Sequence, residues 1–350
     1  MEVRPIWFDS LGAKSSCVLV RTPDLSLLID PGAAIMHPTY PASDPLKEMC
    51  WQAALGEVFI ALKEASHIAI THYHLDHYQP AFLPVYRDKT MWVKDPNRWI
   101  NASQWQQARR FLYGLGAGGV IPLAKAGSAS YENPVSDHGF AGKGSAEADR
   151  RDAWKRTFDD LCQLWQSKPS VDEAALGSRV SFADGRFFRK GQTSVRFTQP
   201  MFHGEEGTCR GWVVGVVVTH GERKLVYTSD LQGPVVEDYA QWIIDERPDM
   251  LILDGPALGP QGRFQKRETA DRAMSHCAAV VREAGADITV LDHHTTRVVE
   301  YRTRAADAYA CGAVTGAELL DRQPLAELLR QGVRPRTCAR TALVRHGERN

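Results

Sequence analysis

Residues 71–77 read Thr-His-Tyr-His-Leu-Asp-His, a stretch that places three histidines and one aspartate within six positions. The four residues before it, His-Ile-Ala-Ile at 67–70, predict a short buried strand that ends where the cluster begins. Since the end of a strand can direct several side chains into one pocket, we expect these residues to share a site. Neutral imidazole is a ligand for zinc or iron, and a carboxylate suits a hard divalent cation.

The composition is that of an ordinary globular protein. The chain has 350 residues, of which 43% are hydrophobic and 24% charged. Lys plus Arg and Asp plus Glu both number 42, so the formal net charge is zero. No global basic field attracts nucleic acid, which argues against a nucleic-acid partner.

The start of the chain and its cysteines indicate where the protein acts. The segment 1–7 contains no long apolar run, and no window approaches the roughly 18 apolar residues of a membrane-spanning helix. The seven cysteines are scattered, and none forms a Cys-x-x-Cys pair. We therefore expect a cytoplasmic protein with reduced thiols and no membrane association, and we leave its oligomeric state open.

Apolar periodicity predicts two strand-rich halves that flank a helical insertion. The predicted strands are 16–20, 25–29, 67–70, 91–93, 187–188, 194–197, 212–219, 224–228, 250–253 and 288–291. The predicted helices are 45–65, 101–112, 152–166 and 268–284. We expect one domain over 1–350 with a helical and loop insertion at 98–180, in which the Gly-rich segment 114–150 is a mobile loop or a lid.

Six predicted strands are each followed within a few residues by a histidine or an aspartate. In chain order these following residues are Asp30, His72, His203, Asp230, Asp254 and 292–294. The carboxyl ends of strands are where α/β folds place their chemistry.

This ordered series resembles the signature of the metallo-β-lactamase superfamily: an early Asp, then His-x-His-x-Asp-His, a lone His, a lone Asp and a final His. The resemblance implies an α/β fold, the metallo-β-lactamase αββα sandwich, here with a helical insertion. It also implies two adjacent metal sites. The ligands of the first would be His72, His74 and His203. The ligands of the second would be Asp76, His77 and His293. Asp230 would bridge the two ions, and Asp30 would orient the cluster by hydrogen bonding.

The final ligand has two candidates. His293 follows the last predicted strand by two residues, as the superfamily's final histidine does, and we favour it. His294 would point to the opposite side of an extended chain, where it would serve as a general acid or contact the substrate.

The resemblance extends further, to a group of uncharacterised stand-alone metallo-hydrolases of this fold that are often found in archaea. The shared features are 9–12 with 14–15, 30–32, 72–74, 94–96, 101–104 with Arg109, 203–205, 229–234 and 292–294.

The resemblance implies a dinuclear metal-dependent hydrolase. Zinc is the first expectation for the two divalent ions, with iron or manganese as alternatives. A metal-bridging hydroxide would attack an ester, lactone, thioester or phosphodiester of a small or medium-sized substrate. Asp76 would orient it or accept its proton, and His294 would protonate the leaving group. Five polar residues are candidate substrate contacts, with surface polarity or helix capping as the alternative: Lys14, Ser15, Asn101, Gln104 and Arg109.

Two further enzymes are compatible with the same ligand set. A nuclease acting on nucleic-acid phosphodiesters would bind RNA with a steep salt dependence. A di-iron redox enzyme would contain iron and consume oxygen, with electrons from a separate partner. A non-catalytic binding protein is a fourth interpretation, disfavoured because the ligand series is complete.

Overall fold

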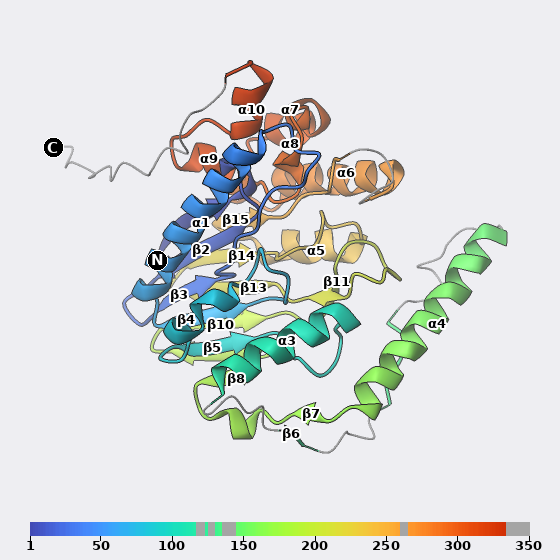
Figure 1. Ribbon diagram of the computed structural model, residues 1–350. Coiled ribbons are helices and arrows are strands. Elements are labelled where there is room, and N and C mark those ends of the chain that lie inside the picture. The colour runs from blue at the N-terminus through green and yellow to red at the C-terminus, as the bar shows by residue number, and fades with distance from the viewer. Residues whose placement is uncertain (117–122, 125–129, 135–144, 260–264, 334–350) are drawn as a thin grey trace.

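The computed structural model describes residues 1–116, 123–124, 130–134, 145–259 and 265–333. Within these residues, two six-stranded sheets form the centre of the molecule (Figure 1). The first sheet contains, in spatial order, β1 (Glu2–Phe8), β2 (Ser16–Arg21), β3 (Ser26–Ile29), β4 (His67–Ile70), β5 (Thr90–Val93) and β8 (Val180–Phe182). The second contains β16 (Ile288–Leu291), β15 (Met250–Leu253), β14 (Arg223–Tyr227), β13 (Val216–His220), β10 (Thr193–Phe197) and β9 (Phe187–Lys190).

Each sheet contains a parallel run whose carboxyl ends lie at one edge. In the first sheet, β3, β4, β5 and β8 are parallel, and in the second, β14, β15 and β16 are parallel. β4 is buried at every position, as expected for a parallel strand covered on both faces. A short hairpin of β11 (Met201–Phe202) and β12 (Trp212–Val213) follows β10, and His203 comes directly after β11.

Three apolar layers hold the sheets and helices together. The layer between the sheets is built from one face of each, for example Val20 and Leu27 against Val218 and Leu225. The alternation that buries these side chains places their neighbours on the outer faces, where helices cover them. Burial of each such side chain contributes roughly 1.5–3 kcal/mol before the entropy of ordering the chain is counted.

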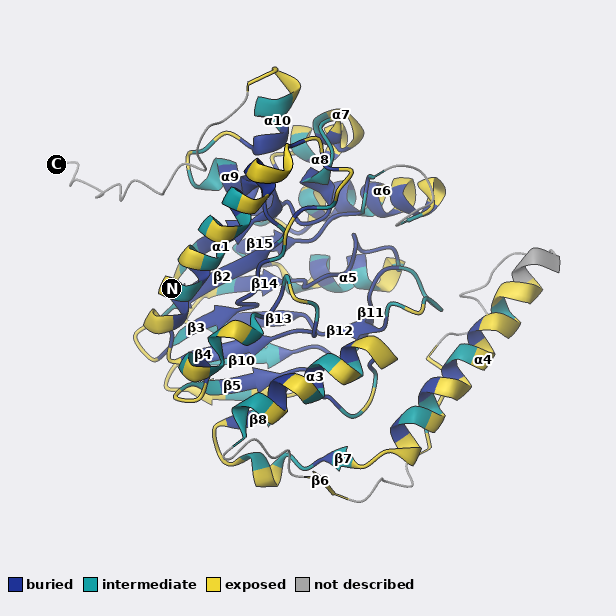
Figure 2. Ribbon diagram, in the orientation of Figure 1, coloured by how far each residue is buried: buried dark blue, intermediate teal, exposed yellow. Residues whose placement is uncertain are grey.

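The helices form the two outer layers. On the first sheet pack α1 (Asp44–Glu64) and α3 (Ala102–Leu115), and on the second pack α5 (Glu237–Glu246) and α6 (Arg267–Glu283). α4 (Ser145–Ser167) stands apart from the sheets, and its Trp154 and Trp165 contact Phe202 and Trp212 of the β11–β12 hairpin (Figure 1). Shorter helices complete the fold: α2 (Leu83–Tyr86), α7 (Tyr301–Arg304), α8 (Ala306–Ala310), α9 (Gly316–Leu319) and α10 (Leu325–Arg330). Most strands are buried, whereas the helices alternate between buried and exposed faces (Figure 2). The predicted αββα sandwich is confirmed.

The helix predictions agree with the structure to within a few residues, except at the start of α4. The helices predicted at 45–65 and 268–284 are α1 and α6, each shifted by one residue. α4 begins at Ser145 rather than 152. The single strand predicted at 212–219 is two strands, β12 and β13, because the chain leaves one sheet and enters another at Val214 and Gly215.

The described part of the predicted insertion at 98–180 contains α3, α4 and a small pairing of β6 (Leu123–Ala124) with β7 (Ser170–Val171). Trp154 and Trp165 of α4 are buried, and Trp165 Nε1 donates a hydrogen bond to the Ile100 carbonyl at 3.0 Å. Much of segment 114–150 lies outside the described residues, so its lid role stays a prediction.

The described cysteines differ from expectation at Cys50. Cys50 is disulfide-bonded, whereas Cys17 and Cys277 are buried free thiols. The expectation of uniformly reduced thiols is therefore wrong for Cys50.

Candidate metal centre

Strand ends from both sheets converge on one site. The loop 71–77 leaves β4 and folds back on itself, with the His77 amide donating to the His74 carbonyl at 2.9 Å. Gly32, beyond the end of β3, allows the two loops to approach closely, because a Cβ there would collide with the backbone of His77 and Tyr78. Local geometry therefore requires glycine where the loops after β3 and β4 meet.

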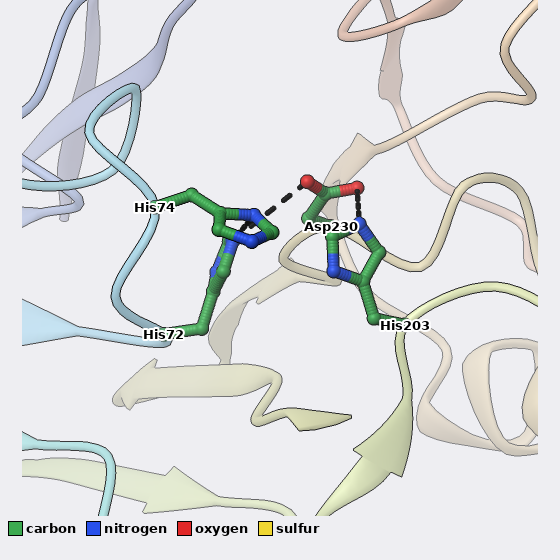
Figure 3. A group of neighbouring side chains, drawn as sticks. All are labelled: His72, His74, His203 and Asp230. Atoms are coloured by element: carbon green, nitrogen blue, oxygen red, sulfur yellow. Dashed lines mark hydrogen bonds and ion pairs between the residues drawn. The ribbon is translucent and has the colours of Figure 1, made fainter. Parts of the chain in front are cut away.

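The three residues predicted to hold the first ion lie together, with Asp230 beside them (Figure 3). His72 Nε2 lies 3.1 Å from His74 Nδ1, and His203 Nε2 lies 3.0 Å from Asp230 Oδ1. These residues come from the loop after β4, the hairpin at β11 and the end of β14. One nitrogen of each histidine and one aspartate oxygen lie within 4.8 Å of one another, a group compact enough for one ion.

The second predicted set is assembled beside the first. His77 Nε2 lies 3.2 Å from His293 Nε2, and Asp76 Oδ2 lies 3.9 Å from the same His293 nitrogen. His77 and His293 are almost fully buried, and Asp76 lies at the edge of the site with 14% of its side chain exposed. Asp76, His77 and His293 form a second group of the same compactness.

Asp230 lies between the two sets. Its Oδ1 faces His203 at 3.0 Å, and its Oδ2 lies 3.7 Å from both His72 Nε2 and His77 Nε2. One carboxylate therefore presents an oxygen to each group, the geometry that a shared ligand requires.

Buried carboxylates orient the histidines of the second set. His77 Nδ1 donates to Asp30 Oδ2 at 2.8 Å, and His293 Nδ1 donates to Asp9 Oδ1 at 3.0 Å. Each bond holds a ring proton on Nδ1, so Nε2 is the nitrogen directed at the centre. Asp30 also accepts from the amide and hydroxyl of Thr71 and from Tyr227, so its predicted orienting position agrees with the geometry.

Asp9 lies in the shared segment 9–12, but sequence reasoning did not identify it as the hydrogen-bond partner of His293. It also accepts hydrogen bonds from the amides of Ser15 and His294 and from Arg297 Nε. Burial alone would raise the pKa of Asp9, but attraction by Arg297 and His293 outweighs burial and holds that pKa far below its usual range.

Arg297 is a second residue that sequence reasoning missed. Its NH2 group lies 3.4 Å from both Asp76 Oδ2 and His293 Nε2, so one cation contacts the second set. Burial would raise the pKa of Asp76, but His77, Lys14 and Arg297 together lower it well below the usual value. Only the separation of 221 residues between Arg297 and Asp76 hid this pair from the sequence.

His294 adopts a left-handed backbone with φ of 64°, which the extended-chain prediction did not anticipate. This turn brings its ring back toward the site instead of away from it. His294 Nδ1 lies 2.9 Å from Asp254 Oδ1 and 3.3 Å from Asp230 Oδ1. His293 forms one group with Asp76 and His77, and both His293 and His294 form another with Asp230, so His293 as the final ligand stays a prediction.

The donor atoms fit a cation better than they fit one another. His203 Nδ1 and Asp230 Oδ1 are buried without a hydrogen-bond partner among the described residues. Two pairs of imidazole nitrogens face each other at 3.1 and 3.2 Å, and in each pair at most one nitrogen can donate. A cation at either group would satisfy lone pairs that the chain itself leaves unpaired, so the clusters fit a metal site.

A cavity of about 980 Å³ opens over the centre. Of the predicted ligands, His74, Asp76, His203 and Asp230 line it, as does His294. Among the candidate substrate contacts, Lys14 and Asn101 line it, and Asn101 also caps α3 through the Gln104 amide at 2.8 Å.

The other three candidate contacts lie elsewhere. Ser15 is buried and donates to the Gly32 carbonyl at 2.6 Å, while the Gln104 side chain bonds the Tyr73 amide and the Arg210 carbonyl. Arg109 stacks on Trp105 and donates to the Pro96 carbonyl at 2.7 Å. These contacts brace the loops around the site rather than face the cavity.

The fold and the clustered side chains are similar to those of the metallo-β-lactamase superfamily. A model of the metallo-beta-lactamase superfamily matches residues 12–78, which hold both the early aspartate and the His-x-His-x-Asp-His series. The resemblance predicted from the sequence is confirmed.

Similar proteins extend the likeness along nearly the whole chain. A UPF0282 protein from Methanopyrus kandleri is 29% identical and covers 92% of this chain and 95% of its own length. Another from Korarchaeum cryptofilum is 28% identical and covers 92% and 90%. Among solved structures, the metallo-beta-lactamase fold protein YhfI from Bacillus subtilis is similar over 89% of this chain and 94% of its own, with 15% identity and a TM-score of 0.43.

Among the described residues, no helix has both the length and the apolar character needed to cross a membrane.

Proposed function

We propose that this protein is a dinuclear metal-dependent hydrolase that cleaves an ester, lactone, thioester or phosphodiester in a small or medium-sized substrate. The observation that carries this proposal is the position of the two ligand groups, side by side at the floor of a 980 Å³ cavity with Asp230 between them. A cavity of that volume is suited to a small or medium-sized molecule.

Each residue has a stated role in this proposal. His72, His74 and His203 hold one ion, Asp76, His77 and His293 hold the other, and Asp230 contributes to both. When bound, two such ions supply a nucleophile at neutral pH and stabilise the developing negative charge. Zinc is the first candidate, with manganese or iron as alternatives for this set of nitrogen and oxygen donors.

The surrounding residues prepare the site. Asp30 and Asp9 fix the rings of His77 and His293, so these ligands need little reorganisation. Asp254 accepts from His294 Nδ1, which leaves His294 Nε2 without a hydrogen bond among the described residues. Burial holds the pKa of His294 well below its usual value, so Nε2 carries the lone pair. We assign to that nitrogen the uptake of a proton from the attacking water and the return of that proton to the leaving group.

The test is metal analysis combined with a substrate screen on protein purified without chelator. Wild-type protein should contain metal and hydrolyse at least one ester, lactone, thioester or phosphodiester. Asp76→Ala should remove turnover while leaving the fold largely intact, because Asp76 lies at the edge of the site. His220→Ala, a histidine change on the hairpin of β13 and β14, is the matched control and should retain activity.

Three outcomes would replace the proposal. Unchanged turnover in Asp76→Ala would contradict the assigned roles. Iron content with oxygen consumption and no hydrolysis would establish the redox alternative. Cleavage of RNA, with binding that weakens steeply as salt rises, would establish the nuclease alternative.

A further inference from the structure

The cavity is lined by both cationic and apolar side chains. Lys14 and Arg210 are two of the cations, and we call these two residues the cation pair. We call the apolar residues of the lining the apolar wall: Met36, Tyr40, Pro41, Leu258, Val298 and Val299. Leu75, between two predicted metal ligands, adds an apolar side chain that is 46% exposed on the same cavity.

Lys14 is positioned by its backbone and leaves its ammonium group available. Its amide and carbonyl pair with those of Ala34 at 2.8 and 2.9 Å, which fixes the segment beside the cavity. Among the described residues, Lys14 Nζ makes neither a hydrogen bond nor an ion pair within 4.0 Å. Asp76 and Asp230 attract it only at longer range.

Arg210 is held in place without being neutralised. Its carbonyl accepts from Asn101 Nδ2 at 2.8 Å and from Gln104 Nε2 at 3.1 Å, which ties its loop to the start of α3. Its NH1 group donates to Gln232 Oε1, a neutral acceptor. The other guanidinium N–H groups make no hydrogen bond among the described residues, although they line the cavity.

The Gln232 side chain is itself held in place, so it fixes the position of the Arg210 guanidinium. Its backbone has φ of 53°, and its amide donates to Asp254 at 2.6 Å. Its Nε2 lies 3.2 Å from His203 Nε2. The guanidinium is therefore coupled through one side chain to the first ligand set.

The other two arginines of the cavity are occupied or peripheral. Arg297 is paired with Asp9 and Asp76, and Arg304 is exposed and donates to the Leu258 carbonyl. Glu205 attracts Arg210 but makes its own hydrogen bond with Thr269 at 3.1 Å. Lys14 and Arg210 thus remain as half-buried cations without a carboxylate partner, an arrangement that an anionic ligand stabilises.

We propose that the cation pair binds an anionic group of the substrate, a carboxylate or a phosphate, while the apolar wall receives the remainder of the molecule. This inference rests on the proposed function, which makes the bound molecule a substrate. It narrows the class of substrate to amphipathic anions. A guanidinium and an ammonium together suit either oxyanion.

Binding to the purified full-length protein tests the inference without relying on turnover. Isothermal titration calorimetry compares phenylbutyrate and phenylbutyl phosphate with the neutral phenylbutyramide, and with acetate, which lacks the apolar part. At least one aromatic anion should bind about tenfold or more tightly than the amide, because charge-assisted hydrogen bonds are strong. The tighter of the two anions identifies the oxyanion, and acetate should bind more weakly than phenylbutyrate.

Charge-neutralising variants locate the anion. Lys14→Gln and Arg210→Gln should each weaken binding of the preferred anion about tenfold and leave the amide unchanged. Arg304→Gln removes one positive charge from the same cavity and is the matched control, with less than about a twofold effect. Equal anion affinity in wild type, Lys14→Gln and Arg210→Gln would overturn the proposal, as would an amide that binds as tightly as both anions.

Metal content measured on the same samples separates the two proposals. Anion preference that depends on Lys14 and Arg210, in a protein that takes up no metal, would contradict the proposed hydrolase but support the anion site. Normal metal content and hydrolysis without anion preference would contradict only the anion site.

Discussion

The two ligand sets lie side by side but are supported differently. In the second set, carboxylates hold His77 and His293 by their Nδ1 atoms, and Arg297 contacts Asp76. In the first set, among the described residues, His203 Nδ1 has no partner and no carboxylate holds a histidine Nδ1 atom. Apart from Asp230, the contacts there are neutral, with Thr71 Oγ1 3.3 Å from His72 Nδ1 and Gln232 Nε2 3.2 Å from His203 Nε2. The comparison indicates that the second set is ordered by the protein, whereas the first depends more on the ion it would hold.

Removing the residue that both sets share should give the largest effect. Asp230→Asn takes away the negative charge between the sets, so metal content should fall below one equivalent and turnover should drop by roughly 10³-fold or more. Elemental analysis and a hydrolysis assay measure the two effects. A variant that kept full metal content would show that Asp230 does not join the sets.

Removing one orienting carboxylate should affect the second set selectively. Asp9→Asn retains an acceptor for His293 but loses the charge, and metal affinity there should fall about 10- to 100-fold. The first set, which Asp9 does not contact, is the internal control in a two-site metal titration. An equal loss of metal affinity at both sites would contradict the proposed difference between the sets. A thermal melt of the variant serves as the control for global unfolding.

The pH dependence of metal uptake should also differ between the sets. Burial lowers the pKa of His74 to about 4, so in metal-free protein this ligand is neutral above about pH 5. Burial would lower the pKa of His293 too, but attraction by Asp9 outweighs burial and raises that pKa well above its usual value. A metal entering the second set must displace that proton, so affinity there should rise with pH through neutrality.

The observable is the number of protons released per metal, from calorimetry in buffers of different ionisation enthalpy. Release of more protons when metal fills the second set than when it fills the first supports the comparison. Release in the reverse order would contradict it.

A backbone contact gives the smallest effect. Gly32→Ala should destabilise the protein by about 1–3 kcal/mol and weaken metal binding, because the added Cβ meets the backbone at His77. Gly56→Ala, within α1 where no atom lies within 4 Å of the added Cβ, is the matched control and should stabilise by about 0.5–1 kcal/mol. Denaturant unfolding measures both, and a stable Gly32→Ala protein would show that the loops need not approach closely.

Much of the site was predictable because its residues follow strands directly. Asp30, His72 and Asp254 each come within two residues of the end of a buried strand, so apolar periodicity alone predicts that they lie at the carboxyl edge of the sheets. The same reasoning placed Asp230 and His293.

What the sequence concealed depends on tertiary packing. Arg297 contacts Asp9 across a separation of 288 residues, and no local pattern signals that pair. The direction of His294 follows from a left-handed backbone that its neighbours impose, so alternation along an extended chain gave the wrong side. The split of 212–219 into two strands likewise reflects a change of sheet rather than a break in apolar character.

Metal content per chain tests the central claim most directly. Elemental analysis of wild-type protein, purified without chelator and then offered zinc, manganese or iron, should give about two metal equivalents. Asp230→Asn prepared in parallel should contain fewer than about one. Wild-type protein that takes up no metal, or that binds the same amount as Asp230→Asn, would contradict the account.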